Sequence, residues 1–254
     1  MHLSDLQPYQ VGPMHRLGSK NDGGYVIPKE LPTISTLISF GVGDNWSFER
    51  SCLKSGIVSN CKMYDHTVGI KIQLRKIKSR LFAANFELKS LLFRIVVALR
   101  YLRDFSNPNL EHIKKEITRN QSTLIKTNLP EIMRDLSGSL FILKVDIEGA
   151  EYEIIEQIES FSQQIPLLLV EFHETDKHKA SFEASLKLLK DKFLICHTHA
   201  NNYEGVSRNG IPKTVEVTFG NREYFKSDKR IPELPISGLD LPSTPNSSDI
   251  YLKF

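Results

Sequence analysis

The segment Leu143-Lys-Val-Asp-Ile-Glu-Gly-Ala-Glu151 decides the fold class of this sequence. Its first six residues alternate between apolar and charged side chains, which is the period of a β-strand. Gly149 then ends the strand, and Glu151 opens a helix, where the helix dipole favours an acidic side chain. A buried strand that leads through a short turn into a helix is the repeating unit of a parallel α/β sheet.

The same alternation of strands and helices continues on both sides of this segment. Strands are predicted over residues 36–40, 61–65, 140–146, 166–173 and 193–197. Helices are predicted over residues 45–54, 128–136, 151–158 and 184–190. This order predicts an α/β fold with a Rossmann-like, doubly wound, mostly parallel sheet that helices cover on both faces. Strand candidates at 214–219 and 249–254 predict an antiparallel edge, and residues 1–254 are expected to form a single domain.

Bulk properties argue against several classes of protein. The net charge of +3 over 254 residues is too small for the dense basic surface of most DNA-binding proteins, so no nucleic-acid partner is expected. The three cysteines form no Cys-x-x-Cys pair, which argues against a zinc knuckle or a disulfide framework. The first ten residues lack the basic and apolar regions of a signal peptide, and no stretch is apolar enough to span a bilayer. These features predict a cytoplasmic protein.

Residues 70–110 differ from the rest of the chain and are expected to form a basic helical insertion. Between residues 70 and 105 lie nine cations and only two acids: Lys71, Arg75, Lys76, Lys78, Arg80, Lys89, Arg94, Arg100 and Arg103 against Glu87 and Asp104. The apolar residues between them predict two amphipathic helices. One interpretation is a cap whose apolar face packs on the core. The other is a surface for an anionic glycan, a phosphorylated lipid carrier or a membrane, which makes peripheral membrane contact through 70–105 an expectation.

Polar residues gather at the carboxyl ends of the predicted strands, where ligands bind in doubly wound folds. These strand-end residues are Gly41, Gly43, Asp65, Asp146, Glu148, Glu171, His173, His197 and His199. Because parallel strands end at the same edge of a sheet, we expect these side chains to line one crevice. Two carboxylates at the end of one strand are costly unless they meet a cation, a metal or a ligand. A solvated turn with a helix cap is the alternative for that strand end.

The turn Gly41-Val-Gly43 and the acid Asp65 favour a nucleoside ligand. Glycine lets the backbone approach a ligand closely, and Asp65 follows after about twenty residues, the spacing at which an acid accepts hydrogen bonds from ribose. The turn lacks the third glycine of the dinucleotide fingerprint, which weakens the alternative of an NAD-dependent dehydrogenase. An ordinary strand-to-helix turn is the other alternative.

Residues 143–152 resemble the signature segment of FkbM-type methyltransferases and their methyltransferase-like relatives. Four further segments resemble that family in the same order, namely Arg16–Val26, Ser39–Glu49, Leu169–His173 and His199–Asn202. Together the matches extend over residues 16–202, and the long signature is the most specific of them. The basic stretch at 70–105 has no counterpart in the family pattern, which leaves the methyl acceptor open.

The resemblance implies a methyltransferase that uses S-adenosylmethionine (SAM). On the matching positions, Phe40 to Gly43 would lie against the methionine part of SAM, Asp65 would hold the ribose, and Asp146 would lie beside donor and acceptor. Many relatives methylate hydroxyl groups of sugars or polyketides, so the expected reaction is O-methylation of a sugar hydroxyl on a glycan or glycolipid. The alternatives are another small-molecule or phosphate-type acceptor, and a SAM-binding protein without catalysis.

Transfer to a hydroxyl group also requires removal of a proton. His173 is the expected base, because a neutral imidazole accepts protons near pH 7, and Asp146 and Glu148 are expected beside it. A core histidine bonded to backbone is the alternative for His173. Asp146, Glu171 and His199, with His173 nearby, also offer the ligands that Mg²⁺ or Mn²⁺ prefers, so metal assistance is a further hypothesis.

Overall fold

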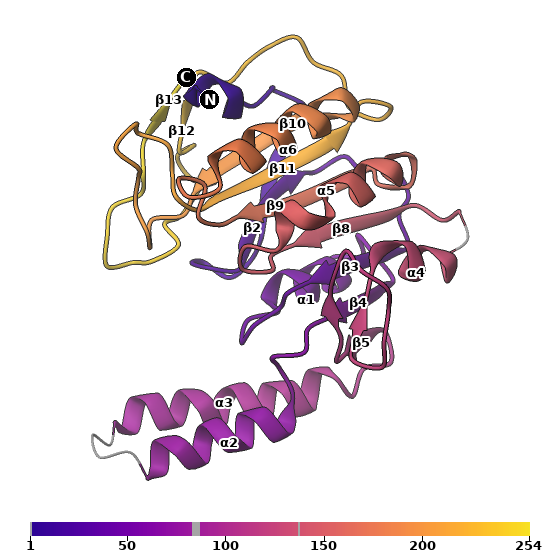
Figure 1. The fold of residues 1–254 in the computed structure, drawn as a ribbon. Coiled ribbons are helices and arrows are strands. Elements are labelled where there is room, and N and C mark those ends of the chain that lie inside the picture. Colours follow the sequence, from indigo (N-terminus) through magenta and orange to yellow (C-terminus); the bar gives the residue numbers. More distant parts are fainter. Residues whose placement is uncertain (1, 83–86, 137) are drawn as a thin grey trace.

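A seven-stranded sheet forms the centre of the computed structural model, which describes residues 2–82, 87–136 and 138–254 (Figure 1). In spatial order its strands are β10 (Phe193–Ala200), β11 (Val215–Asn221), β9 (Leu167–Phe172), β8 (Phe141–Val145), β3 (Thr36–Phe40), β4 (Asn60–Tyr64) and β5 (Leu110–Ile113). The five strands from β9 to β5 are parallel, and β11 is antiparallel to both of its neighbours. The predicted doubly wound, mostly parallel α/β sheet is therefore confirmed.

The direction of winding reverses between β3 and β8, which lie side by side with Phe40 opposite Val145. From β3 the chain moves outward to β4 and β5, and then returns to β8 and continues to β9. Such a reversal leaves a crevice beyond the carboxyl ends of the two central strands, because the helices that follow them lie on opposite faces of the sheet.

Two apolar layers cover the sheet. On one face, helices α4 (Leu129–Arg134), α5 (Glu151–Ser160) and α6 (Lys179–Lys192) pack on alternate strand residues such as Leu143 and Val145. On the other face, α1 (Ser47–Lys54) and the antiparallel pair β1 (Met14–Gly18) and β2 (Gly24–Pro28) pack on the intervening residues, including Ile142. Of the alternating residues 143–148, only Leu143 to Val145 belong to the strand β8, and Asp146–Gly149 form the turn after it. The strands β3, β8 and β9 are buried on both faces.

The basic stretch forms two helices, α2 (Ile70–Leu81) and α3 (Leu88–Asp104), as its periodicity predicted. They pack against each other and extend away from the sheet as a helical hairpin (Figure 1). Among the described residues, only the ends of the two helices nearest the sheet join the core, through Ile70 of α2 and through Val97 and Tyr101 of α3. The expectation that the apolar face of this stretch packs on the core therefore holds for its base alone. Residues 83–86, within the predicted helical stretch, lie outside the described residues.

The antiparallel edge differs from the prediction for the C-terminal tail. The pair at the edge is β10 and β11, and β11 lies between β9 and β10. The last predicted strand is shorter than expected, because only β13 (Leu252–Lys253) forms, and it pairs with β12 (Glu233–Leu234) outside the main sheet. The remaining short elements are β6 (Glu116–Ile117), β7 (Lys126–Thr127), and the 3-10 turns at Leu3–Leu6 and Ser162–Gln164. Among the described residues, no helix has both the length and the apolar character needed to cross a bilayer.

Candidate active site

A cavity of about 640 Å³ opens at the carboxyl ends of β3, β4, β8 and β9, within the usual size range of small-molecule sites. Its walls include most of the residues that the sequence placed there: Gly41, Val42, Gly43, Asp65, Asp146, Glu148, Glu171 and His173. Phe40 is fully buried behind the wall, and His199 is not among the lining residues. The strand ends therefore converge on one crevice, as the parallel sheet requires.

The glycine turn after β3 is fixed by the turn after β8. A Cβ atom at Gly41 would lie 1.6 Å from the carbonyl oxygen of Asp146, and its φ of +73° favours glycine as well. The Asp146 amide in turn donates to the carbonyl of Phe40 over 2.9 Å. Gly43 differs, because a Cβ atom there would meet only open space at the cavity. Gly41 thus brings the two turns into contact, and Gly43 leaves room for a ligand.

Asp65, at the end of β4, organises the same turn. Its Oδ2 accepts hydrogen bonds of 2.9 Å from the amides of both Val42 and Gly43, and its Oδ1 accepts from the amide and hydroxyl of Thr67. Burial alone would raise the pKa of Asp65, but these hydrogen bonds outweigh burial and lower it. The carboxylate is therefore charged and held at the cavity wall. That it also binds a ribose stays a prediction.

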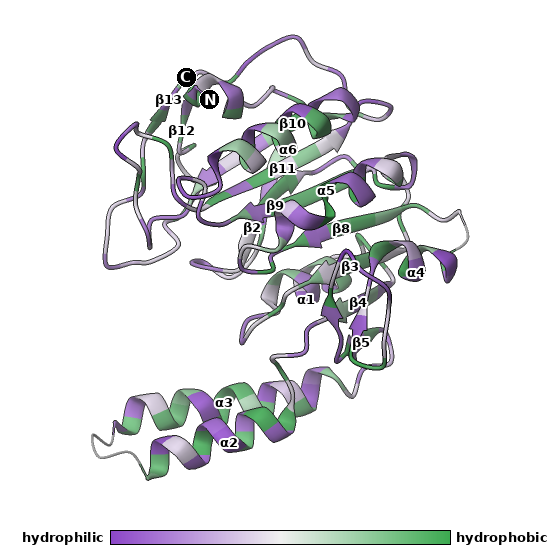
Figure 2. Ribbon diagram, in the orientation of Figure 1, coloured by the Kyte–Doolittle hydropathy of each residue, from purple (hydrophilic) through white to green (hydrophobic). Residues whose placement is uncertain are grey.

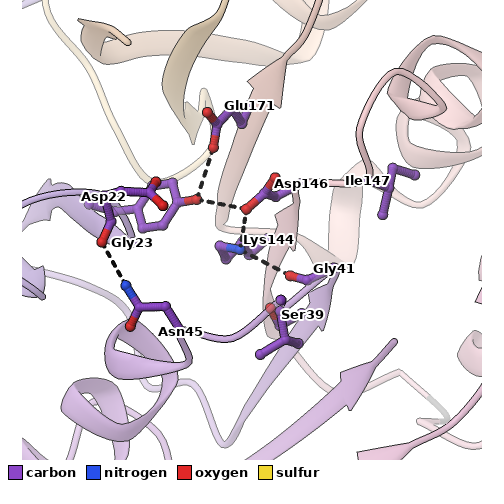
Figure 3. Close-up of polar contacts among 12 residues, drawn as sticks. Asp22, Gly23, Ser39, Gly41, Asn45, Lys144, Asp146, Ile147 and Glu171 are labelled. Carbon is purple, nitrogen blue, oxygen red and sulfur yellow. Dashed lines mark hydrogen bonds and ion pairs between the residues drawn. The ribbon is translucent and has the colours of Figure 1, made fainter. Parts of the chain in front are cut away.

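Lys144 is a buried cation at the centre of the site (Figure 3). Its Nζ donates to Asp146 Oδ2 over 3.0 Å and to the Gly41 carbonyl over 3.1 Å, and it lies 4.0 Å from Glu49. Burial alone would lower the pKa of Lys144, but the nearby Asp146 and Glu49 carboxylates outweigh it and raise the pKa. The lysine therefore stays charged and offsets the carboxylates on the cavity wall.

Tyr25 and Asn201 bring two further segments of the chain to the site. The Tyr25 hydroxyl lies 3.2 Å from Asp146 Oδ2 and 3.4 Å from Glu171 Oε2, and the Asn201 amide donates to Glu171 Oε1 over 3.0 Å. The β1–β2 turn that precedes Tyr25 is held at the cavity by Asn45, which donates to the Asp22 carbonyl over 2.6 Å (Figure 3). Burial, and then the charges of Asp146 and Glu216, raise the pKa of Glu171 well above its usual range.

His173 does not fit its predicted role as a neutral base. Its Nδ1 lies 2.6 Å from Glu151 Oε1, while its Nε2 lies 3.7–3.9 Å from carboxylate oxygens of Asp146, Glu148 and Glu171. Burial would lower the pKa of His173, but the hydrogen bond to Glu151 and the surrounding charges outweigh it and raise the pKa to about 10. The imidazolium is therefore the favoured form at neutral pH, and an imidazolium cannot accept a proton.

His199 lies apart from the predicted metal set. Its Nδ1 lies 3.4 Å from Glu216 and its Nε2 lies 3.2 Å from Asp249, and these partners raise its pKa to about 10 against the effect of burial. His197 is likewise paired, with its Nε2 3.1 Å from Asp240. The sequence placed both histidines at the crevice because they end a strand, but β10 is separated from β9 by β11.

The residues that do meet at metal-ligand spacing are Asp146, Glu171 and His173. One ligand atom from each lies within 4.8 Å of the other two. A cation there would compete with the Lys144 ammonium for Asp146, and with the proton on His173. Asp22, Glu171 and Glu216 form a second group at the same spacing, which deepens the negative charge at this end of the cavity.

Several important residues escaped prediction from the sequence. The sequence does contain a sign of the role of Lys144, because a lysine between the apolar residues of a buried strand needs a nearby acid to balance its charge. Glu151 was interpreted as a helix-dipole residue, yet it is fully buried and accepts from the amides of Ile147 and Gly149 as well as from His173. Tyr25 and Asn201 lie in two of the segments that resemble the family, but the sequence predicted no role for them, since tertiary structure brings them to Glu171.

The chain is similar to a known protein family and, more distantly, to several solved structures. The model of the FkbM methyltransferase domain matches residues 40–203, which are 164 of the 254 residues. No curated protein matches the chain. Among solved structures, spermidine synthase from Thermotoga Maritima shares 12% identity with a TM-score of 0.41, over 75% of this chain and 55% of that chain. TrmK of M. capricolum, in complex with S-adenosyl-homocysteine, shares 11% identity with a TM-score of 0.40, over 77% of this chain and 66% of that chain.

These structural likenesses are too distant to bear on the activity, and the match to the synthase spans only about half of the synthase chain. The family match carries the assignment, because it covers well over half of the sequence and includes three of the segments that line the cavity, at Gly41–Gly43, at Asp65 and within Leu143–Glu151. The cavity at the ends of the central strands lies within the matched residues for most of its wall. The chain therefore belongs to the FkbM methyltransferase family and uses S-adenosylmethionine as its methyl donor.

Proposed function

We propose that the enzyme methylates a hydroxyl group of a sugar, on a glycan or a glycolipid. The observation that carries the proposal is Glu171, a carboxylate on the cavity wall whose pKa burial raises well above its usual range. Burial makes Glu171 a stronger base than an ordinary carboxylate when it is ionised, and the His173 charge and the hydrogen bond from Asn201 favour that ionised form. The ionised carboxylate also accepts a hydrogen bond from a hydroxyl group. A hydroxyl acceptor needs both properties.

The two ends of the cavity suit different parts of the reaction. Gly41, Gly43 and Asp65 line the end that fits the cofactor, since the turn is open at Gly43 and Asp65 is charged. Asp146, Glu171 and Asn201 line the other end, where their side chains offer acceptors and donors to a polyhydroxylated molecule. When bound, SAM supplies a methyl group on a positively charged sulfur, and the protein's part is to hold the acceptor oxygen in line with it.

In this proposal Glu171 would take the hydroxyl proton and become neutral. The acceptor oxygen would gain the methyl group as the methyl–sulfur bond of SAM breaks, which would leave neutral S-adenosylhomocysteine. Lys144 stays charged beside Asp146 and compensates the negative charge that surrounds the oxygen. The protonated His173 has the same effect from the other side of the carboxylates. Both cations are held by protein acids, so they are positioned before the acceptor arrives.

The charge of the site argues against one of the two other acceptor classes, the phosphate-bearing one, but not against the other, the amines. A phosphate-bearing acceptor would meet the carboxylates of Asp22, Asp146, Glu148 and Glu171 on the cavity wall, and like charges disfavour it. An amine acceptor is the second candidate, because the same carboxylates would attract an ammonium group. An amine must lose its proton before methylation, which a raised pKa at Glu171 also favours.

The test measures transfer of labelled methyl from SAM to three acceptor classes: neutral oligosaccharides, sugar phosphates and primary amines. We expect methyl ethers on the oligosaccharides alone. Glu171→Gln should lower kcat by about 100-fold or more while SAM affinity stays the same, because general-base catalysis contributes about that much. Glu153→Gln, on the exposed side of α5, is the matched control. Methylation of amines or phosphates without methylation of sugars would overturn the proposal.

A chelator tests separately whether a metal ion at Asp146 and Glu171 assists the reaction. Because Lys144 and the protonated His173 already supply positive charge to these carboxylates, we expect activity to survive a chelator. Activity that is lost to the chelator and restored by Mg²⁺ or Mn²⁺ would instead assign a catalytic ion to this cluster.

A further inference from the structure

The α2–α3 hairpin leaves an unusual amount of apolar surface exposed. Along α3, Leu88, Leu92, Val96, Leu99 and Leu102 are each about half exposed, with exposed fractions from 48% to 62%. At 100° per residue these five positions fall on one face of the helix. Leu74 and Leu81 are similarly exposed on α2, at 55% and 51%. Figure 2 shows hydrophobic residues interspersed with hydrophilic ones along both helices. Such a continuous apolar face normally marks a docking surface.

The cations of the hairpin lie beside this apolar face. Six of the nine have no acidic partner among the described residues, namely Lys71, Arg75, Lys78, Arg80, Lys89 and Arg100. On α2, Lys71 and Lys78 fall on the same side of the helix as Leu74 and Leu81. Nothing within the described protein neutralises these charges, so the surface is complementary to an anionic partner that also accepts apolar side chains.

Charge is divided sharply between the hairpin and the rest of the protein. Residues 70–105 carry nine cations and two acids, a net charge of +7, whereas the whole chain carries +3. The remaining residues therefore carry a net charge of −4. An anionic surface would attract the hairpin and repel the body, which orients the molecule with the hairpin toward that surface.

The base of the hairpin is fixed to the cofactor turn. Asp44, which directly follows Gly43, accepts hydrogen bonds from Gln73 over 2.6 Å and from Lys76 over 3.1 Å, and it also pairs with Arg94. Burial alone would raise the pKa of Asp44, but these bonds outweigh burial and lower it. Trp46 adds a second link by donating to Asp104 over 2.8 Å. The hairpin is thus anchored to the turn that lines the cavity.

We propose that the exposed face of the α2–α3 hairpin docks on the surface of an anionic lipid bilayer. Its leucine and valine side chains enter the boundary between headgroups and acyl chains, and the flanking lysines and arginines contact the lipid phosphates. A second copy of the chain fits less well, because it would bring two surfaces of +7 together. Nucleic acid fits less well too, since the exposed side chains are mainly aliphatic, whereas bases stack on aromatic ones.

The test is co-sedimentation of the full-length protein with vesicles, without SAM or acceptor. We expect binding to vesicles of phosphatidylcholine with phosphatidylglycerol and none to phosphatidylcholine alone. Lys71→Glu/Lys78→Glu should lower the partition coefficient at least tenfold, because each cation near the surface contributes measurably to binding. Lys179→Glu/Lys187→Glu, which makes the same charge change on the exposed side of α6, should bind like the unmodified protein.

The apolar contribution has its own pair of variants. Leu92→Ser/Leu99→Ser should weaken vesicle binding, whereas Leu124→Ser/Ile125→Ser, which changes two exposed residues outside the hairpin, should not. Failure to bind anionic vesicles would overturn the proposal. So would equal loss of binding in hairpin and control variants, or a dimer that becomes a monomer in Leu92→Ser/Leu99→Ser. The assay contains no acceptor, so its outcome is independent of the proposed sugar methylation.

Discussion

The Nδ1 of His173 lies 2.6 Å from Oε1 of Glu151, a carboxylate that is fully buried at the start of α5. This pair joins the end of β9 to the turn after β8, since the same Glu151 oxygen also accepts from the amides of Ile147 and Gly149. The histidine is thereby oriented with its Nε2 toward the carboxylates of the cavity. Its positive charge therefore balances the Asp146 and Glu171 carboxylates of the cavity in the folded protein.

We expect His173 to stay protonated at pH 8. A pKa of about 10 in the folded protein, against about 6.5 when unfolded, means that folding favours the charged ring. Its contribution to the free energy of unfolding is therefore fully present below pH ~6.5 and is lost as the pH rises through about 10. Thermal unfolding from pH 6 to 10 should show a larger loss of stability in the unmodified protein than in His173→Gln. Parallel curves for the two proteins would contradict the prediction.

Gly41→Ala should destabilise the protein far more than Gly56→Ala. Both glycines have a φ near +70°, so both substitutions carry the left-handed strain of about 1–2 kcal/mol. Only at Gly41 would the new Cβ collide with backbone, 1.6 Å from the Asp146 carbonyl, whereas Gly56 has open space. Chemical denaturation measures the difference. Equal losses of unfolding free energy in the two variants would show that the close contact between the β3 and β8 turns does not affect stability.

Asp65→Asn should weaken SAM binding by about 10-fold or more, because the variant loses a carboxylate that accepts hydrogen bonds at both of its oxygens. Calorimetry with SAM and S-adenosylhomocysteine measures the effect, and NAD should not bind the unmodified protein. Asp135→Asn, on the half-exposed end of α4, is a control of the same chemistry. Unchanged SAM affinity in Asp65→Asn would remove this residue from the cofactor site.

Lys144→Met should lower the free energy of unfolding by about 3–5 kcal/mol, the usual cost of removing one partner of a buried ion pair. Asp146 and Glu49 would lose their nearest cation. Lys62→Met, at a less buried position on β4, two strands away in the same sheet, should leave stability almost unchanged. A similar denaturation midpoint for both variants would indicate that water reaches the Lys144 site and screens its partners.

The fold was predictable from sequence because the central strands are encoded locally. Residues 36–40 were predicted to the residue, and 140–146 within one residue at each end, since apolar runs bounded by glycine or acid mark buried strands. The strand-end residues of the cavity wall, among them Gly41, Asp146 and Glu171, were predictable because parallel strands end at the same edge of a sheet. The insertion of β11 between β9 and β10 had no local signal, because it depends on pairing between distant segments.

The protonation state of the site was not predictable in the same way. His173 was expected to be neutral because its ordinary pKa lies near 7, and only its surroundings reverse that expectation. Those surroundings come from Glu151, Asp146 and Glu171, whose approach to one ring depends on how two turns pack. Electrostatics at short range is a property of tertiary structure, whereas strand alternation is a property of neighbouring residues.

Asp44 has a thermodynamic consequence, because it is bonded to the hairpin on one side and continuous with the cofactor turn on the other. Two ligands that act on one shared element are coupled reciprocally. If hairpin occupancy tightens SAM binding by some factor, SAM must tighten hairpin binding by that same factor. A rise in the cellular concentration of SAM would then move enzyme molecules from bulk solvent to the docking surface, with no change in the amount of protein.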